Sequence, residues 1–146
     1  MIRILEECQS EDKPTKFQTG DIITHIRYGY RGVIVHTDPK FKGAQIWYLS
    51  NQTQPQKEQS WFFVLVTGSQ QVTYVAEENL NHYHPRNTVV HPMLTLFFSG
   101  YVAELNRYIF AMMCNGTRVR HPMLPHLFRH PIFNHPVLHL YNILPL

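Results

Sequence analysis

The sequence predicts an all-β fold, a small antiparallel β-barrel that carries one short C-terminal helix. Short runs of β-branched and aromatic residues are separated by turn-forming glycine, proline, asparagine and aspartate, which is typical of strands joined by turns. The sequence contains four or five such strands, one long connecting segment and no helical repeat. This pattern suits a small barrel better than a sandwich. The 146 residues are enough for one domain with a core of its own.

The first two predicted strands form a hairpin. Residues 22–28 and 30–36 are rich in β-branched side chains, and they are separated by Gly29. A glycine at this point permits the backbone to reverse direction. Pro39 ends the second strand, since proline has no N–H group to donate to a ladder.

The segment 40–60 is too long for a simple turn, and a loop of this length usually has a function or some structure of its own. A short helix is expected over 44–49, whereas 51–60 is a glutamine-rich polar stretch. Residues 61–66 are continuously apolar, which predicts a strand covered on both faces. Residues 72–76 return as its antiparallel partner after a tight turn.

A short helix is predicted over residues 91–98, packed across the barrel. Pro92 favours a position near a helix N-terminus, and the apolar residues at 93, 94, 97 and 98 follow helical spacing. We expect Ser99-Gly100 to end this helix.

Three regions follow from the pattern. Residues 1–15 are expected to be a flexible lead-in, 16–110 the organised domain, and 111–146 a His/Pro-rich tail of uncertain structure.

The chain has no run of about 20 apolar residues and no signal-peptide pattern, so we expect a cytoplasmic protein away from membranes. Cys8 and Cys114 are best interpreted as two free thiols, although a disulfide between them stays open.

Several blocks of the sequence, which follow one another in the order expected for the family, resemble the YccV/HspQ family. This family is labelled the hemimethylated-DNA-binding domain. They are Phe17-Gln18-Thr19-Gly20-Asp21-Ile22-Ile23 continuing to Val35, then Asp38-Pro39, Gln59-Ser60-Trp61-Phe62-Phe63-Val64-Leu65-Val66, Thr73-Tyr74-Val75-Ala76-Glu77-Glu78-Asn79-Leu80, and His91-Pro92 with Phe97-Phe98 and Arg107-Tyr108. Ordered blocks with compatible spacing are far more specific than a single motif.

The resemblance covers about two-thirds of the chain and implies an SH3-like β-barrel. It implies a DNA-binding module, and equally an adaptor for protein quality control, because HspQ-type members are associated with heat-shock degradation by ATP-dependent proteases. The sequence departs from the family at Ser60 and Phe62-Phe63, which replace the usual proline and Tyr-His beside the tryptophan. Residues 111–146 and the lead-in have no counterpart in it.

Catalysis and metal binding are not expected. The chain has no Gly-x-Ser-x-Gly elbow and no phosphate-cradling loop, and the adjacent Glu77 and Glu78 would point to opposite faces of a strand. Two groups of histidines invite a metal hypothesis, but they lack the cysteine or carboxylate ligands and regular spacing of zinc sites. They are His82, His84 and His91, and His121, His126, His130, His135 and His139. We therefore predict exposed loop histidines and no cofactor.

The cluster 27–31 is the strongest candidate for binding. Arginine contacts phosphates or guanine, and tyrosine stacks on bases. Strand alternation would place Tyr28 and Tyr30 on one face, with Arg27 and Arg31 beside them. The alternative is a tyrosine-anchored corner whose arginines are solvated or paired with Glu77 and Glu78.

Two functions from different classes therefore stay open. The first is DNA contact, hemimethylated DNA included, through Arg27, Tyr28, Tyr30, Arg31, Lys40 and Lys42. The second is a protein-interaction adaptor, whose partner would be a protease or its substrates, through Trp47, Tyr48 and Trp61. A homo-oligomer is compatible with both.

Overall fold

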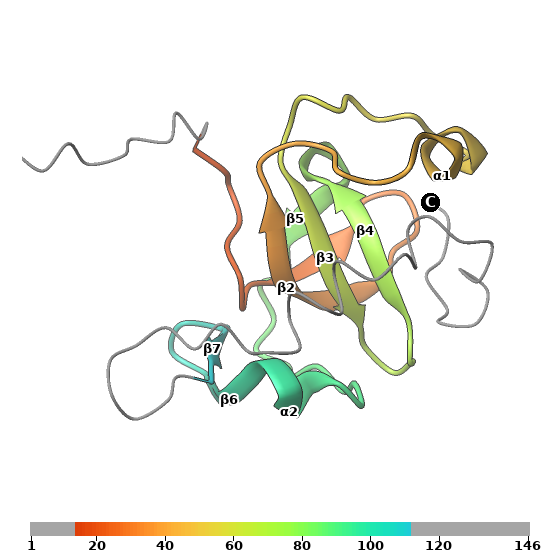
Figure 1. The fold of residues 1–146 in the computed structure, drawn as a ribbon. Helices are drawn as coiled ribbons and strands as arrows, with labels where there is room; N and C mark the ends of the chain where they lie inside the picture. The colour runs from red at the N-terminus through yellow and green to blue at the C-terminus, as the bar shows by residue number, and fades with distance from the viewer. Residues whose placement is uncertain (1–13, 112–146) are drawn as a thin grey trace, which may run out of the picture.

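The computed structural model describes residues 14–111, and a five-stranded antiparallel sheet lies at its centre (Figure 1). The strands are β1 (Ile22–His25), β2 (Arg31–Asp38), β3 (Trp61–Val66), β4 (Val72–Ala76) and β5 (Leu80–His82). Their order in the sheet is β4-β3-β2-β1-β5. The predicted lead-in and tail, with Cys8, Cys114 and the histidines beyond His91, fall almost entirely outside the described residues, so those predictions stay open.

Strand β3 is the best-packed element of the sheet, as its continuous apolar sequence predicts. All six of its residues are buried, and its side chains are covered, with the Trp61 ring packed near Phe41 and the Phe62 ring near Phe17. Strands β2 and β4 pair with its two edges. The β2–β3 register shifts between Ile34 and His36, which marks a bulge at Val35. The predicted β1–β2 and β3–β4 hairpins are both confirmed.

The segment between β2 and β3 contains the expected short helix, α1 (Gln45–Ser50). Its Trp47 is buried and contributes to an aromatic cluster that includes Phe41, Trp61 and Tyr74. The start of this segment is fixed by polar contacts as well. The Tyr74 hydroxyl donates to Asp38 Oδ2 at 2.8 Å and accepts from the backbone N–H of Lys42 at 3.2 Å.

The helix predicted over 91–98 is shorter than expected and leads into a second hairpin. Helix α2 (Leu94–Phe97) is followed by β6 (Phe98–Val102) and β7 (Arg107–Phe110), which form a separate two-stranded sheet. The helix ends at Phe97, just before Ser99-Gly100 as expected, but these two residues continue in β6 beside a register shift. Figure 1 shows α2, β6 and β7 below the five-stranded sheet and α1 above it.

The described chain is thus β-rich, with two short α-helices in the regions where short helices were expected, and a 3-10 turn, η1 (Glu77–Asn79), between β4 and β5. Among residues 14–111 the strand pairing does not join β4 to β5, so closure into an SH3-like barrel stays a prediction. No helix in this part of the chain is both long and apolar enough to cross a membrane.

Candidate nucleic-acid interface

Residues 26–30 form the tip of the β1–β2 hairpin, and their backbone is tightly fixed. Strand β1 ends at His25, whose N–H donates to the Tyr30 carbonyl at 2.9 Å, and Gly29 N–H donates back to the His25 carbonyl at 2.9 Å. Gly29 has a φ of +70°, in the left-handed region that glycine adopts without strain. The alternation expected through Tyr28 therefore stops at the end of β1, and the tip is a turn.

His25 lies directly beneath the tip and was not among the predicted site residues. Its side chain is 1% exposed, and its Nδ1 accepts from the backbone N–H groups of Arg27 and Tyr28, each at 3.1 Å. The imidazole is therefore neutral, with its proton on Nε2. Burial, with a smaller effect of Arg27, lowers the pKa of His25 from 6.5 to about 4. A histidine at a strand end carries no distinctive signal in the sequence.

The two tyrosines of the tip have different environments. The Tyr30 hydroxyl is within hydrogen-bond distance of Thr73 Oγ1, at 3.0 Å, and burial raises the Tyr30 pKa. Tyr30 is therefore an anchor, as the alternative interpretation of the cluster expected. Tyr28 is 41% exposed, and Arg27 Cζ lies 5.8 Å from its ring centroid. Of these two tyrosines, Tyr28 is the one presented to solvent as a ring on which a base can stack.

Arg31 is held on the segment that follows β5. Its guanidinium lies 4.9 Å from the Tyr83 ring centroid, and it donates to the carbonyls of Asn87 at 3.3 Å and Thr88 at 3.2 Å. The expected alternative partners are engaged elsewhere. Glu77 accepts from the Thr15 hydroxyl and the Lys16 N–H, and Glu78 accepts from the Gln56 N–H.

Lys40 and Lys42 lie beyond the far end of β2 from the tip. Arg31 begins this eight-residue strand and Asp38 ends it. At about 3.3 Å per residue, the strand places roughly 20 Å between the two groups of cations. Lys42 Nζ is also paired with Asp38 Oδ1 at 3.1 Å. The six predicted DNA-contact residues therefore do not form one cluster.

The placement of the two tryptophans on an exposed contact surface is wrong. Trp47 is 2% exposed and Trp61 is 0% exposed, because both rings pack in the aromatic cluster against Phe41 and Tyr74. Tyr48 is half-buried, and its hydroxyl donates to the Pro55 carbonyl at 2.8 Å. Of the three residues predicted for protein interaction, only Tyr48 retains an accessible surface.

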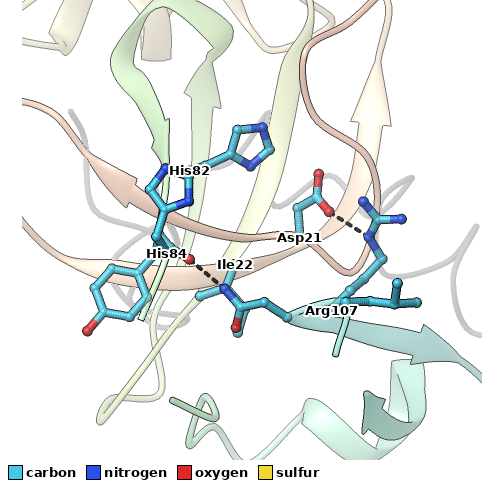
Figure 2. A pocket seen from close by; sticks show the side chains of 8 residues that line it. Asp21, Ile22, His82, His84 and Arg107 are labelled. Atoms are coloured by element: carbon cyan, nitrogen blue, oxygen red, sulfur yellow. Dashed lines mark hydrogen bonds and ion pairs between the residues drawn. The ribbon is translucent and has the colours of Figure 1, made fainter. Parts of the chain in front are cut away.

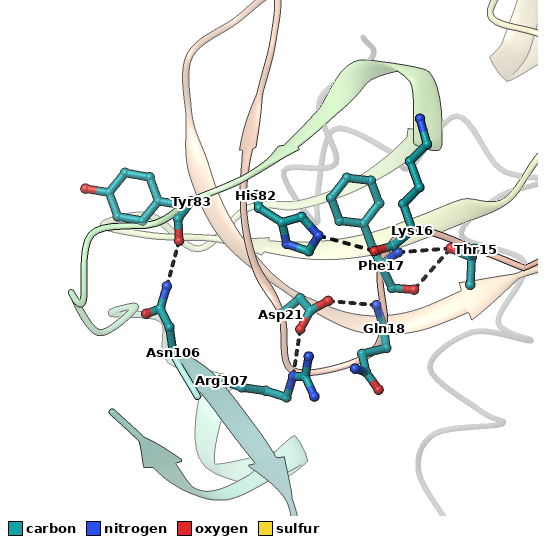
Figure 3. Close-up of polar contacts among 9 residues, drawn as sticks. All are labelled: Thr15, Lys16, Phe17, Gln18, Asp21, His82, Tyr83, Asn106 and Arg107. Atoms are coloured by element: carbon teal, nitrogen blue, oxygen red, sulfur yellow. Dashed lines mark hydrogen bonds and ion pairs between the residues drawn. The ribbon is translucent and has the colours of Figure 1, made fainter. Parts of the chain in front are cut away.

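A groove of about 140 Å³ lies where the β6–β7 hairpin meets β1 and β5 (Figure 2). The residues that line it are Asp21, Ile22, His82, Tyr83, His84, Leu105, Asn106 and Arg107. Its charges are paired. Arg107 Nε donates to Asp21 Oδ1 at 2.7 Å, and Asp21 Oδ2 accepts from the Gln18 N–H at 2.9 Å (Figure 3). Within residues 14–111 no three His, Cys, Asp or Glu side chains are grouped to hold a metal ion.

The groove is best explained as a structural joint between the two sheets. Asn106 Nδ2 donates to the Tyr83 carbonyl at 2.7 Å, and Tyr108 N–H donates to the Gly20 carbonyl at 2.9 Å. The first bond connects the β6–β7 turn to the end of β5, whereas the second, with the Asp21–Arg107 ion pair, connects β7 to the residues just before β1. Asp21 also compensates the charge of Arg107, so this groove offers little net charge to an anionic ligand.

Replacing Arg107 with alanine is expected to lower the free energy of unfolding by about 1–2 kcal/mol, because Asp21 would keep its buried carboxylate but lose a charge-assisted hydrogen bond. Urea-induced unfolding monitored by circular dichroism measures the loss. The matched control is Arg86→Ala, an exposed arginine whose removal should change stability by less than about 0.5 kcal/mol. Equal effects of the two substitutions would contradict the role of the ion pair.

The structure is a small β-rich domain that exposes Arg27 and Tyr28 at a hairpin tip, which is the kind of surface found in a binding module. Residues 15–105 match the family described as hemimethylated DNA-binding protein YccV like, and the chain belongs to this YccV-like family. The resemblance found in the sequence is thereby confirmed. Searches of curated proteins and of solved structures gave no match.

Proposed function

We propose that this protein is a DNA-binding module that contacts DNA through the tip of the β1–β2 hairpin. The observation that carries the proposal is the exposed pair of Arg27 and Tyr28 on a backbone fixed from below by His25. Membership of a family described as hemimethylated DNA-binding supports the same conclusion. An arginine for phosphate or guanine and a tyrosine ring for stacking are the side chains that such a contact requires.

The roles within the tip differ in this proposal. Arg27 and Tyr28 contact DNA directly, Tyr30 anchors the tip, and Arg31 adds a positive charge beside it. A duplex that lies along β2 would also reach Lys40 and Lys42, although Lys42 would have to share its charge with Asp38. So few phosphate contacts predict modest affinity and a shallow dependence on salt.

The test is a titration of hemimethylated and unmethylated duplexes by fluorescence anisotropy over a series of salt concentrations. Replacing Arg27 or Arg31 with alanine should weaken binding to all duplexes, and should reduce the slope of log K against log salt by about 0.9 for each phosphate that the variant no longer neutralises. Arg31→Lys tests whether the stacked guanidinium or the charge alone is needed.

Lys57→Ala is the matched control. This lysine lies over the rings of Phe41 and Tyr48, beyond the far end of β2 from the tip, and its carbonyl accepts from the Phe41 N–H, which places it beside Lys40 and Lys42. Its removal should leave the salt slope unchanged when the tip alone holds the DNA, and should lower the slope if the duplex lies along β2. No saturable binding at low salt would refute the proposal. Equal affinity for hemimethylated and unmethylated duplexes would refute only the reading of methylation.

The second candidate is a cytoplasmic protein-interaction adaptor for an ATP-dependent protease. The observation that favours it is the outer side of α1, where Ile46 is 80% exposed and Leu49 is 61% exposed. Two apolar side chains three residues apart on a helix share one face and suit a protein partner. The double substitution Ile46→Asp and Leu49→Asp should abolish recovery of the protease in a pull-down while DNA affinity is unchanged. Full recovery would argue against the adaptor.

A further inference from the structure

We infer that the hairpin tip is a wedge, which inserts Ile26 and Tyr28 into the base stack of a duplex while Arg27 contacts the adjoining phosphates. This inference rests on the proposed DNA binding and adds how the DNA is engaged. It predicts a preference for duplexes whose bases separate easily, such as those with a mismatch. Three features of the tip support it: the exposure of the two side chains, the open space at Gly29 and the rigidity of the turn.

The tip presents apolar surface that the fold does not use. Ile26 is 56% exposed and Tyr28 is 41% exposed, although β1 ends just before them with the buried His25. Proteins that insert side chains between base steps use apolar wedges, isoleucine among them, together with basic side chains such as arginine. If a helix or strand of the described chain packed on the tip, it would cover Ile26.

The tip also has open space at Gly29. A Cβ atom built there would meet no atom of the described residues within 4 Å, apart from its chain neighbours, so the turn is open in the direction of a side chain at this position. A narrow turn with open space beside it fits between bases more readily than a flat sheet face. The exposed side chain of Ile26 lies at the start of this turn and that of Tyr28 near its apex.

The base of the tip is rigid, which a wedge requires. Ile26 N–H donates to the Asn79 carbonyl at 2.9 Å, and the two following N–H groups are held by His25 Nδ1. The His25 ring also lies near those of Tyr28 and Tyr30, with centroids 4.7 Å and 5.0 Å away. Because the turn is ordered before binding, the free energy of contact is available for unstacking bases.

The test uses duplexes that carry 2-aminopurine, whose fluorescence rises when it is unstacked, with anisotropy measured on the same samples. The wild-type protein should increase 2-aminopurine fluorescence several-fold and bind a mismatched duplex more tightly than a paired one. The double variant Ile26→Ala/Tyr28→Ala should lose the fluorescence rise and the mismatch preference but retain salt-dependent binding through Arg27 and Arg31. Tyr28→Phe should behave as the wild type, since stacking needs only the ring.

Ile46→Ala is the matched control, because this isoleucine is also exposed but lies on α1, away from the tip. It should leave fluorescence and affinity unchanged. Binding without a rise in fluorescence, or an equal rise in the double variant, would overturn the wedge and leave the proposed function intact. Absence of binding to every duplex at low salt would overturn both. Complete loss of binding in a folded double variant would overturn the division of roles proposed here, since the arginines would then hold no DNA by themselves.

Discussion

Replacing Trp61 with alanine is expected to lower the free energy of unfolding by about 3–5 kcal/mol, the range for truncating a large aromatic residue in a core. The side chain is 0% exposed, and its ring centroid lies 4.9 Å from that of Phe41 and 5.2 Å from that of Tyr74. Removal would leave a cavity between β3 and the segment that contains α1. A loss of this size is a large fraction of the stability of a small domain.

Urea-induced unfolding followed by far-ultraviolet circular dichroism measures this loss without relying on tryptophan fluorescence. Leu49→Ala is the control, because Leu49 is 61% exposed on α1 and its truncation should change stability by less than about 0.5 kcal/mol. Trp61→Phe should lie between the two. If Trp61→Ala were as stable as the control, the tryptophan would not be a core residue.

Acidification from pH 7 to pH 4 is expected to destabilise the protein through His25. The pKa of its imidazole is about 4 in the folded protein and about 6.5 in the unfolded chain, so between these values only the unfolded chain binds the proton. The free energy of unfolding therefore falls as the pH is lowered through this window, by about 3 kcal/mol in total. A proton on Nδ1 would also face the N–H groups of Arg27 and Tyr28, so the tip should loosen first.

Unfolding free energies measured at several pH values between 7 and 4 test this expectation. His91, whose pKa is lowered mainly by burial, contributes in the same direction. The control His25→Asn retains an acceptor near the position of Nδ1 but cannot titrate. In this variant the free energy of unfolding should depend less on pH, by the contribution of one proton. This holds whether the substitution itself stabilises or destabilises the protein. An unchanged slope would show that His25 is not the titrating group.

The parts of the fold that were predicted are those in which local sequence and burial agree. Residues 61–66 are apolar without interruption, and a strand covered on both faces is the arrangement that buries all of them. The β6–β7 hairpin was missed because Ser99-Gly100 has the composition of a turn. Its position is determined instead by contacts with Gly20 and Asp21, far away in the sequence.

The candidate site was predicted by residue type but not by arrangement. Arg27 and Tyr28 are exposed as a binding hairpin requires, yet Tyr30 turns inward to Thr73. The reason is the turn at Gly29, whose positive φ breaks the alternation on which the prediction depended. The surface placement of the two tryptophans is wrong because composition alone does not tell an aromatic core from an aromatic patch.

The joint between β1 and β7 has a consequence for the order in which the protein matures during its synthesis. Asp21 and Arg107 are separated by 86 positions, and Gly20 receives its hydrogen bond from Tyr108. A ribosome synthesises the chain from its N-terminus at about 5–20 residues per second. Arg107 and Tyr108 are therefore made several seconds after Gly20 and Asp21. In that interval the β3–β4 hairpin is already complete. Among residues 14–111, the start of β1 is therefore a part of the nascent domain that stays long without its final contacts.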